Sequence, residues 1–203
     1  MATKTKPRQP GADRILDVVL SLCAERPWRE ITMEEIADAA GATLSRVYKF
    51  YPTRPAIVAG LLARVDKAVL SDHDSEDTDE PYRDRLLDVL MRRFEAQSLH
   101  KPAIRSILRD LTFDPILAVC SMPAFANSMA WSLEASGIRA NGPLGLIRIK
   151  GLGLIYLSAI RVWLNDETPD LSVTMSRLDR DLRLAETLIT ALPCRERNVS
   201  EGN

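Results

Sequence analysis

The chain has 203 residues, of which 46% are apolar and only 5% aromatic, and its formal net charge is −1. This length allows one or two domains with a substantial core, and the composition favours a helical bundle over a β-sandwich. The near-zero total charge excludes nothing about nucleic acid, but its distribution is uneven. Residues 1–70 carry eleven Lys and Arg against eight Asp and Glu, whereas residues 71–203 carry sixteen against twenty. A basic N-terminal part is compatible with phosphate binding.

Cysteine usage and hydropathy limit the compartment. Cys23, Cys120 and Cys194 are few, odd in number and widely spaced, so they predict neither a disulfide framework nor a metal site. We expect free thiols in a reducing cytosol, with a redox role of Cys120 as the alternative. The N-terminus has no apolar run typical of a signal peptide, and the apolar stretch 143–164 is interrupted by three cations. The expected location is therefore cytoplasmic, without a membrane span.

The first residues predict a flexible segment followed by a helix. Residues 1–11 combine Lys and Arg with Pro, Gly and Thr, which is typical of a solvated tail or of a basic arm that reaches along DNA. Apolar residues then recur at helical spacing in Asp13–Ala24. Trp28, which follows the end of this helix, is interpreted as a core aromatic.

The segment 31–51 predicts two short helices joined by a tight turn. Thr32 is a good N-cap, and Glu35 is placed to complete a capping box. Gly41 follows the first helix, where a left-handed conformation is often required. Thr43 caps a second helix that runs to Phe50. Helix, glycine-containing turn and helix is the arrangement of a DNA-binding helix-turn-helix.

The second of these helices is unusually polar for a core element. Its apolar anchors are Val47 and Phe50, and hydroxyl and cationic side chains fill the rest of two turns. A plain helical hairpin buried in an all-α core is the alternative, but such a hairpin needs no cluster of hydroxyls and cations on one face. The pattern therefore favours DNA recognition.

The segment 31–57 resembles the tetracycline-repressor (TetR) family of transcriptional regulators. The shared pattern is a Thr-capped helix, Ile-Ala-x-x-Ala-Gly, a short cap, Tyr-x-aromatic-aromatic, Pro, a small polar residue and a cation. Here it consists of Thr32, Ile36–Gly41, Tyr48–Tyr51, Pro52, Thr53 and Arg54. The similarity extends over about residues 12–65. It implies an all-α fold of about nine helices, with a three-helix DNA-binding head and a helical body that binds a ligand and dimerises.

Two positions depart from the family pattern. Ser45-Arg46 stands where two small residues are usual, and Pro55 stands where an acidic residue is common. The first departure suggests an additional cationic contact, and the second fits a proline in the first turn of a helix. The resemblance implies that Leu44 and Ser45 approach base edges and that the cations and hydroxyls bind phosphates. The predicted DNA-binding residues are Thr32, Thr43, Leu44, Ser45, Arg46, Tyr48, Lys49 and Arg54.

The remaining chain predicts further helices and one acidic loop. SDHDSEDTDE, starting at residue 71, is interpreted as a solvated loop between a head at 12–54, linked by helix 55–70, and a body at 71–203. The expected body helices are 83–99, 102–110, 115–120, 123–136, 143–165 and 170–192. His73 lies among the acids without a second histidine nearby, so no metal site and no cofactor are predicted.

The last two predicted helices indicate a dimer interface. Helix 143–165 is apolar on nearly every side, which requires cover all round. Helix 170–192 carries an apolar 4-3 spacing over three heptads. Two such helices from each subunit form a four-helix bundle, as the resemblance also implies. The predicted interface residues are Leu154, Ser158, Arg161, Met175, Leu178, Leu182, Ala185 and Ile189.

The middle helices concentrate apolar and soft side chains. Ordinary core packing is one interpretation, and a pocket for a hydrophobic or amphipathic effector is the other. The predicted pocket residues are Met91, Phe94, Phe113, Met122, Phe125, Met129 and Trp131.

Other functions receive less support. The sequence shows no nucleophile–base pair, paired carboxylates, phosphate loop or metal spacing, so an enzyme is not predicted. The segment 162–171 also resembles, more loosely, part of a mitochondrial lipid-binding protein of ubiquinone biosynthesis. A lipid-binding protein of the same fold without DNA binding is therefore the alternative, but the cations Arg46, Lys49 and Arg54 disfavour it. The preferred interpretation is a dimeric DNA-binding regulator, a repressor that a small hydrophobic ligand releases from a palindromic operator.

Overall fold

The computed structural model describes residues 11–71 and 80–191, with side chains described as far as residue 187 in the last helix. These residues contain helices and no strand, which confirms the all-α prediction. The helices are α1 (Ala12–Glu25), η1 (Trp28–Glu30), α2 (Met33–Ala40), α3 (Leu44–Phe50), α4 (Arg54–Ser71), α5 (Tyr82–Gln97), η2 (Ser98–His100), α6 (Lys101–Phe113), α7 (Pro115–Ala135), α8 (Gly142–Trp163) and α9 (Ser172–Ala191). The basic arm up to residue 10, His73 and Cys194 lie outside the described residues.

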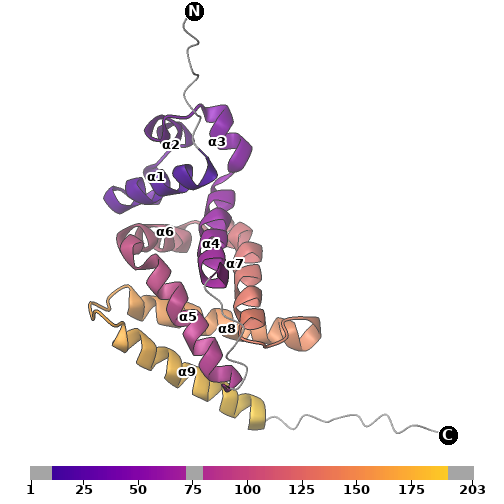
Figure 1. The fold of residues 1–203 in the computed structure, drawn as a ribbon. Helices are drawn as coiled ribbons and strands as arrows, with labels where there is room; N and C mark the ends of the chain where they lie inside the picture. Colours follow the sequence, from indigo (N-terminus) through magenta and orange to yellow (C-terminus); the bar gives the residue numbers. More distant parts are fainter. Residues whose placement is uncertain (1–10, 72–79, 192–203) are drawn as a thin grey trace, which may run out of the picture.

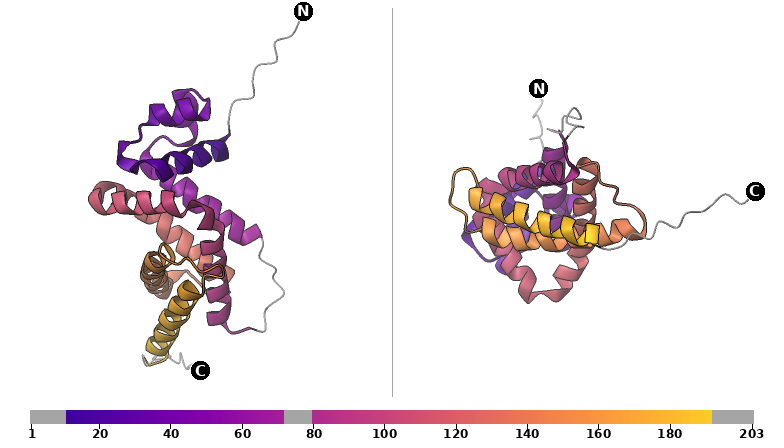
Figure 2. Two further views of the ribbon diagram at one scale, coloured as in Figure 1. Left: turned by 90° about the vertical axis from the view of Figure 1, so that its left-hand side faces the viewer. Right: turned by 90° about the horizontal axis from the view of Figure 1, so that it is seen from below.

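The molecule is elongated, with a three-helix head at one end. Figures 1 and 2 show α1, α2 and α3 at this end and α8 and α9 side by side at the other. Helix α4 runs from the head into the body, where it packs against α5 and α7. Helix α6 lies directly beneath α1. Two helices, α4 and α6, therefore connect the head to the rest of the chain.

The core of the head continues into the body. Trp28, Ile36 and Val47 are buried in one cluster with residues of α1 and α4. The same cluster includes Ala103 and Ile107 from α6. Head and body side chains bury apolar area against each other in this cluster. The removal of that area from water stabilises the packing of the head on the body.

A second apolar cluster holds the body together. Its fully buried members come from α5, α7, α8 and α9 and include Phe94, Met129, Trp163 and Leu178. Phe94 lies between two aromatic rings, with ring centroids 5.0 Å from Tyr156 and 5.4 Å from Trp163. Offset aromatic contacts of this kind add to the hydrophobic stabilisation of a core.

One predicted helix boundary is wrong. A break was expected between residues 120 and 123, but α7 is continuous through Pro123. A proline inside a helix removes one backbone hydrogen bond, and this cost must be offset by tertiary contacts. Helix α7 supplies them, since it packs along α4 and also contacts α5, α6 and α8.

Two of the described helices, α7 and α8, have the length and apolar composition of a membrane-crossing helix. About a third of each apolar window is buried inside the protein, and the core helices of soluble proteins have the same properties. The length and composition of these two helices are therefore only weak evidence for a membrane span.

The turn between α8 and α9 is organised by one buried carboxylate. Asp166 accepts hydrogen bonds from the Thr168 hydroxyl at 2.5 Å, and from the backbone and hydroxyl of Thr174 at 2.8 and 2.6 Å. Burial alone raises the pKa of this carboxyl, but the hydrogen bonds from Thr168 and Thr174 outweigh it and lower the pKa to about 2. Leu171, just before α9, adopts a left-handed φ of 52°.

We expect Asp166→Asn to destabilise the fold by about 2 kcal/mol at pH 7, because the amide replaces an ionised acceptor. A lowered carboxyl pKa contributes stability that is fully present above the unfolded value of 3.8 and is lost as the pH falls toward 2. The difference between the wild-type and variant proteins should therefore shrink between pH 5 and pH 2 in urea unfolding curves. A difference that stays constant over this range contradicts the assignment, and Asp170→Asn, at an exposed position of the same turn, is the control.

Candidate nucleic-acid interface

The helix-turn-helix forms through the local signals in its sequence. The Thr32 hydroxyl accepts a hydrogen bond from the Glu35 backbone N–H at 3.2 Å, and the Glu35 carboxylate accepts one from the Thr32 N–H at 2.8 Å. Gly41 ends α2 in the left-handed conformation with φ 65°, and the Thr43 hydroxyl accepts from the Arg46 N–H at 3.2 Å to start α3. Each helix end thus has its free N–H groups or carbonyls satisfied within a few residues.

The capping box also fixes the charge of its carboxylate. Hydrogen bonds from the Thr32 backbone and from the Arg26 side chain lower the pKa of Glu35. The Thr32 hydroxyl in turn donates to Glu35 at 3.1 Å. The Thr32 hydroxyl was also predicted to bind phosphate. In the structure it caps α2, and the phosphate contact stays a prediction.

Helix α3 presents a continuous polar face to solvent. Val47 anchors the helix in the head core, while Leu44, Tyr48 and Lys49 are exposed, Tyr48 to 68%. Thr43 and Ser45 are exposed beside them. Figure 1 shows α3 on the outside of the head. The buried-hairpin alternative for 31–51 is therefore wrong, because this face covers no part of the core.

Arg46 lies at the edge of this face. Its guanidinium stacks over the ring of Phe50 at 4.8 Å, one turn along the same helix, and the side chain is half-buried. A planar guanidinium stacked on a ring is held in one orientation. This geometry suits either a phosphate or a guanine edge.

Arg54 has a structural role that was not predicted from the sequence. Its guanidinium donates to the carbonyl of Trp28 at 2.6 Å and to the carbonyl of Ile31, and it stacks over the Trp28 ring at 4.6 Å. In the structure the Arg54 guanidinium bonds within the head, and its phosphate contact stays a prediction. Its charge is used inside the head, where it joins the start of α4 to the segment that leads into α2.

Tyr51, directly after α3, is positioned by close contact with α4. Its hydroxyl reaches the carbonyl of Ala12 at 3.5 Å, and a Cβ added to Gly60 would lie 2.5 Å from its ring. Gly60 is thus the residue that lets the end of α3 approach α4 so closely. This contact could not be predicted, because a lone glycine inside a helix has several explanations.

We expect Gly60→Ala to destabilise the protein by about 1–3 kcal/mol, since the added methyl displaces the Tyr51 ring. Helix propensity alone predicts the opposite sign, because alanine is favoured over glycine by about 1 kcal/mol in a helix interior. Ala63→Gly, at an exposed position of the same helix, measures the propensity term by itself. Thermal unfolding of the three proteins checks the result, and a stabilised Gly60→Ala variant refutes the contact.

Three hydrogen bonds fasten the head to α6. The Ser106 hydroxyl donates to the Arg26 carbonyl at 3.2 Å and accepts from the Trp28 N–H at 3.1 Å. The Asp110 carboxylate accepts from the Arg29 N–H at 2.6 Å. Ser106 and Asp110 are buried, and unpaired buried groups at this junction would be costly. These two residues were not predicted from the sequence.

The N-terminal half of α6 is hydrogen-bonded to the turn between α8 and α9. Lys101 donates to the backbone carbonyl of Asp166 at 2.5 Å, and Arg105 donates to the backbone carbonyl of Leu164 and to the Asn165 side chain. Helix α6 is therefore bonded to the head through its middle and C-terminal part and to the α8–α9 turn through its N-terminal half.

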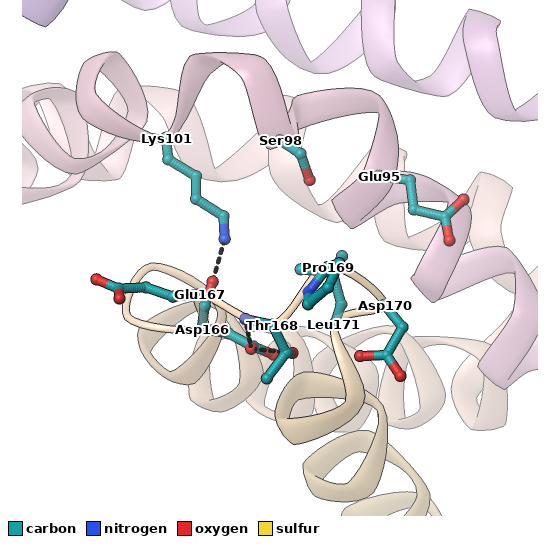
Figure 3. A pocket seen from close by; sticks show the side chains of 9 residues that line it. All are labelled: Glu95, Ser98, Lys101, Asp166, Glu167, Thr168, Pro169, Asp170 and Leu171. Atoms are coloured by element: carbon teal, nitrogen blue, oxygen red, sulfur yellow. Dashed lines mark hydrogen bonds between the residues drawn. The ribbon is translucent and has the colours of Figure 1, made fainter.

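A cavity of about 340 Å³ lies at this turn, between the α5–α6 junction and the α8–α9 loop. Figure 3 shows Glu95, Ser98 and Lys101 on one side of it and the loop from Asp166 to Leu171 on the other. Its lining is mostly polar and charged, unlike the apolar pocket that was predicted. In the described part of the chain, no group of three His, Cys, Asp or Glu side chains is placed to hold a metal ion.

The predicted pocket residues divide into two groups. Met91, Phe94 and Met129 are buried in the body core, with Phe125 half-buried beside them. The other three are exposed on the surface, and their prediction as pocket residues is wrong: Phe113, Met122 and Trp131. Phe113 is the last residue of α6, and Met122 and Trp131 lie on α7, which was predicted as two shorter helices.

The predicted dimer residues also divide. Leu178 and Leu182 are buried against the chain's own body, so their prediction as interface residues is wrong. Part of the apolar 4-3 stripe of α9 therefore packs within its own subunit. The exposed members are Leu154, Arg161 and Met175, with Ser158 and Ala185 half-buried. The Ile189 side chain lies outside the described residues.

The exposed side of α8 remains apolar after this correction. Ile147 and Leu154 are exposed one heptad apart, Leu154 to 71%, and Leu144 lies exposed one turn earlier. Gly151 lies between them, with open space where a Cβ would point. We refer to Leu144, Ile147, Gly151 and Leu154 as the α8 face.

Comparison with solved structures identifies the fold. A TetR transcriptional regulator from Nitrosomonas europaea superposes with a TM-score of 0.69 at 19% identity, over 88% of this chain and 99% of the other. A TetR regulator from Rhodococcus sp. RHA1 gives 0.64 at 18% identity, over 85% and 93%. Thermus thermophilus FadR, a TetR-family repressor solved with lauroyl-CoA, gives 0.51 at 24% identity, over 94% and 99%. No family model and no curated protein matches the chain. The predicted TetR fold is confirmed.

Proposed function

We propose that this chain is a TetR-family transcriptional regulator that binds a palindromic operator in double-stranded DNA as a homodimer. The proposal includes a repressor role, release by a small hydrophobic or amphipathic effector, a cytoplasmic location, and no catalytic activity, cofactor or metal. It assigns residues 12–54 to DNA binding, helix 55–70 to the link, and residues 71–203 to effector binding and dimerisation.

The exposed face of α3 is the observation that carries the proposal. A two-turn helix that follows a left-handed glycine, with Thr43, Ser45, Tyr48 and Lys49 directed to solvent, fits the major groove of DNA. In this proposal Leu44 and Ser45 approach base edges, where Leu44 meets a thymine methyl, and Tyr48 and Lys49 bind phosphates. Arg46 contributes either a phosphate contact or a guanine contact.

The α8 face supports the homodimer. A set of exposed apolar side chains on one helix needs cover, and a second copy that pairs the same face by two-fold symmetry supplies it. The symmetry then places two recognition helices on two half-sites, spaced by one or more turns of DNA.

Selection from a pool of random duplex DNA, at two salt concentrations, tests DNA binding directly. We expect enrichment of a palindromic motif, with recovery that falls steeply as salt rises, because phosphate neutralisation releases counterions. The absence of enrichment at both salt concentrations favours the alternative of a lipid-binding protein of this fold. Mass spectrometry of molecules that copurify with the protein then identifies its ligand.

A further inference from the structure

A buried ion pair links α4 to the body in the middle of the apolar core. The Arg93 guanidinium on α5 donates to the Asp66 carboxylate on α4 and, at 2.7 Å, to the Ser128 hydroxyl on α7. The Ser128 hydroxyl donates to the same Asp66 oxygen at 2.6 Å. Arg93 is only 1% exposed, and Ser128 is fully buried. Three helices are thus joined through one guanidinium.

The surroundings of this pair are apolar and aromatic. The guanidinium lies over the Tyr156 ring at 5.5 Å, and Tyr156 packs against Phe94 and Phe125. Met129 is fully buried in the same cluster. A buried ion pair contributes little net stability, because the cost of removing two charges from water offsets their attraction. Stability alone therefore does not explain why the body contains this pair, which indicates a functional role.

Arg93 has hydrogen-bonding capacity that the described part of the chain does not use. Its Nε is buried and has no hydrogen-bond acceptor there. Guanidinium carries five donors in a planar fork that matches the two oxygens of a carboxylate. Asp66 binds through a single oxygen, Oδ1, so the fork is only partly occupied.

Asp66 lies on the helix that begins in the head. Helix α4 starts at Arg54, which is bonded to the Trp28 and Ile31 carbonyls, and Asp66 follows three turns later. The Asp66 side chain keeps 11% exposure, so water reaches it more readily than Arg93. A competitor on Arg93 would free α4 at this point while Asp66 becomes hydrated.

We propose that the effector is an amphipathic carboxylic acid whose carboxylate replaces Asp66 on Arg93, with its apolar tail packed against Phe94, Phe125 and Met129. This inference rests on the proposed function and names the ligand class and the release step. One carboxylate exchanges for another, so the number of buried charges does not change. A neutral or cationic ligand provides no such replacement and leaves Arg93 paired with Asp66. Release of Asp66 removes a constraint on α4 and so alters the position of the head.

Decanoate and 1-decanol, measured by calorimetry on the full chain without DNA, test the head-group preference. We expect decanoate to bind about tenfold or more tightly than decanol. Asp66→Asn removes the competing carboxylate, so it should increase decanoate affinity by a further factor of about ten and leave decanol binding unchanged. A merely structural role of Asp66 predicts weaker or unaltered binding instead. Asp88→Asn, which removes a surface carboxylate of α5, is the matched control.

The double variant Asp66→Asn/Arg93→Gln removes both charges together and so avoids an unpaired buried ion. We expect it to keep its fold by circular dichroism and to lose the preference for decanoate over decanol. A double variant that retains this preference, or an Asp66→Asn variant with wild-type decanoate affinity, overturns the proposal. Release of the wild-type protein from its selected operator by decanoate is measured separately. If no operator is selected but the calorimetric results hold, the proposed function fails and the Arg93 site stands.

Discussion

Leu154→Arg is expected to convert the proposed homodimer into a monomer and to reduce operator affinity by about a hundredfold or more. Leu154 is 71% exposed in the single chain and lies on the α8 face with Ile147 and Gly151. Two-fold symmetry places two copies of each residue near the same axis, so the variant introduces two like charges into an apolar contact. Light scattering after size exclusion measures the mass, and operator titration measures the affinity.

The size of the effect on DNA binding follows from the linkage of two half-sites. In a dimer, binding of one recognition helix holds the second at a high effective concentration near its half-site, and a monomer loses this advantage. Leu99→Arg is the matched control, because Leu99 is 91% exposed on η2 and lies away from the α8 face. If Leu154→Arg remains dimeric, or if Leu99→Arg dissociates equally, the α8 face is not the interface.

Local signals explain why the head was predictable from its sequence. The capping box of Thr32 and Glu35, the left-handed Gly41 and the Thr43 cap all act within three or four residues. Interactions over such distances leave a direct trace in residue order. The helix bounds and the exposed character of α3 therefore agree with the prediction.

The orientation of helix faces in the body was much less predictable. The apolar spacing of α9 correctly indicates a helix with one apolar stripe, but the stripe does not say what covers it. Leu178 and Leu182 pack into their own subunit, whereas Met175 from the same stripe is exposed, and α8 presents a further set of exposed apolar side chains. Likewise, a residue type cannot distinguish Met129 in the core from Met122 on the surface.

The long-range polar contacts left no pattern at all in the sequence. Ser106 and Asp110 bond to head residues about 80 positions earlier, and Arg93 meets Asp66 and Ser128 from two other helices. A single Ser, Asp or Arg inside a helix usually faces solvent. Only the packing of α4 and α6 shows that these side chains are buried and that they connect the body to the head.

Arg54→Met is expected to reduce stability, and Lys49→Met is expected to reduce the salt dependence of DNA binding. This difference separates a structural cation from a DNA-binding one. Loss of Arg54 leaves the carbonyls of Trp28 and Ile31 without their charged donor, at a cost of about 2–4 kcal/mol in stability. Lys49 is exposed on α3, so its replacement should change stability by no more than about 0.5 kcal/mol. Urea unfolding measures both values.

The salt dependence of operator binding distinguishes the two cations independently of stability. A residue that neutralises one phosphate contributes about one to the slope of log affinity against log salt. We expect Lys49→Met to reduce the slope by about one, and Arg54→Met to leave it unchanged at temperatures where the variant is folded. The reverse pattern would return Arg54 to the phosphate contact. The stacked geometry of Arg54 on Trp28 favours the structural role, because a guanidinium that donates to two carbonyls holds α4 and the entry to α2 in one fixed arrangement. The spacing of α3 relative to α4 depends on that arrangement.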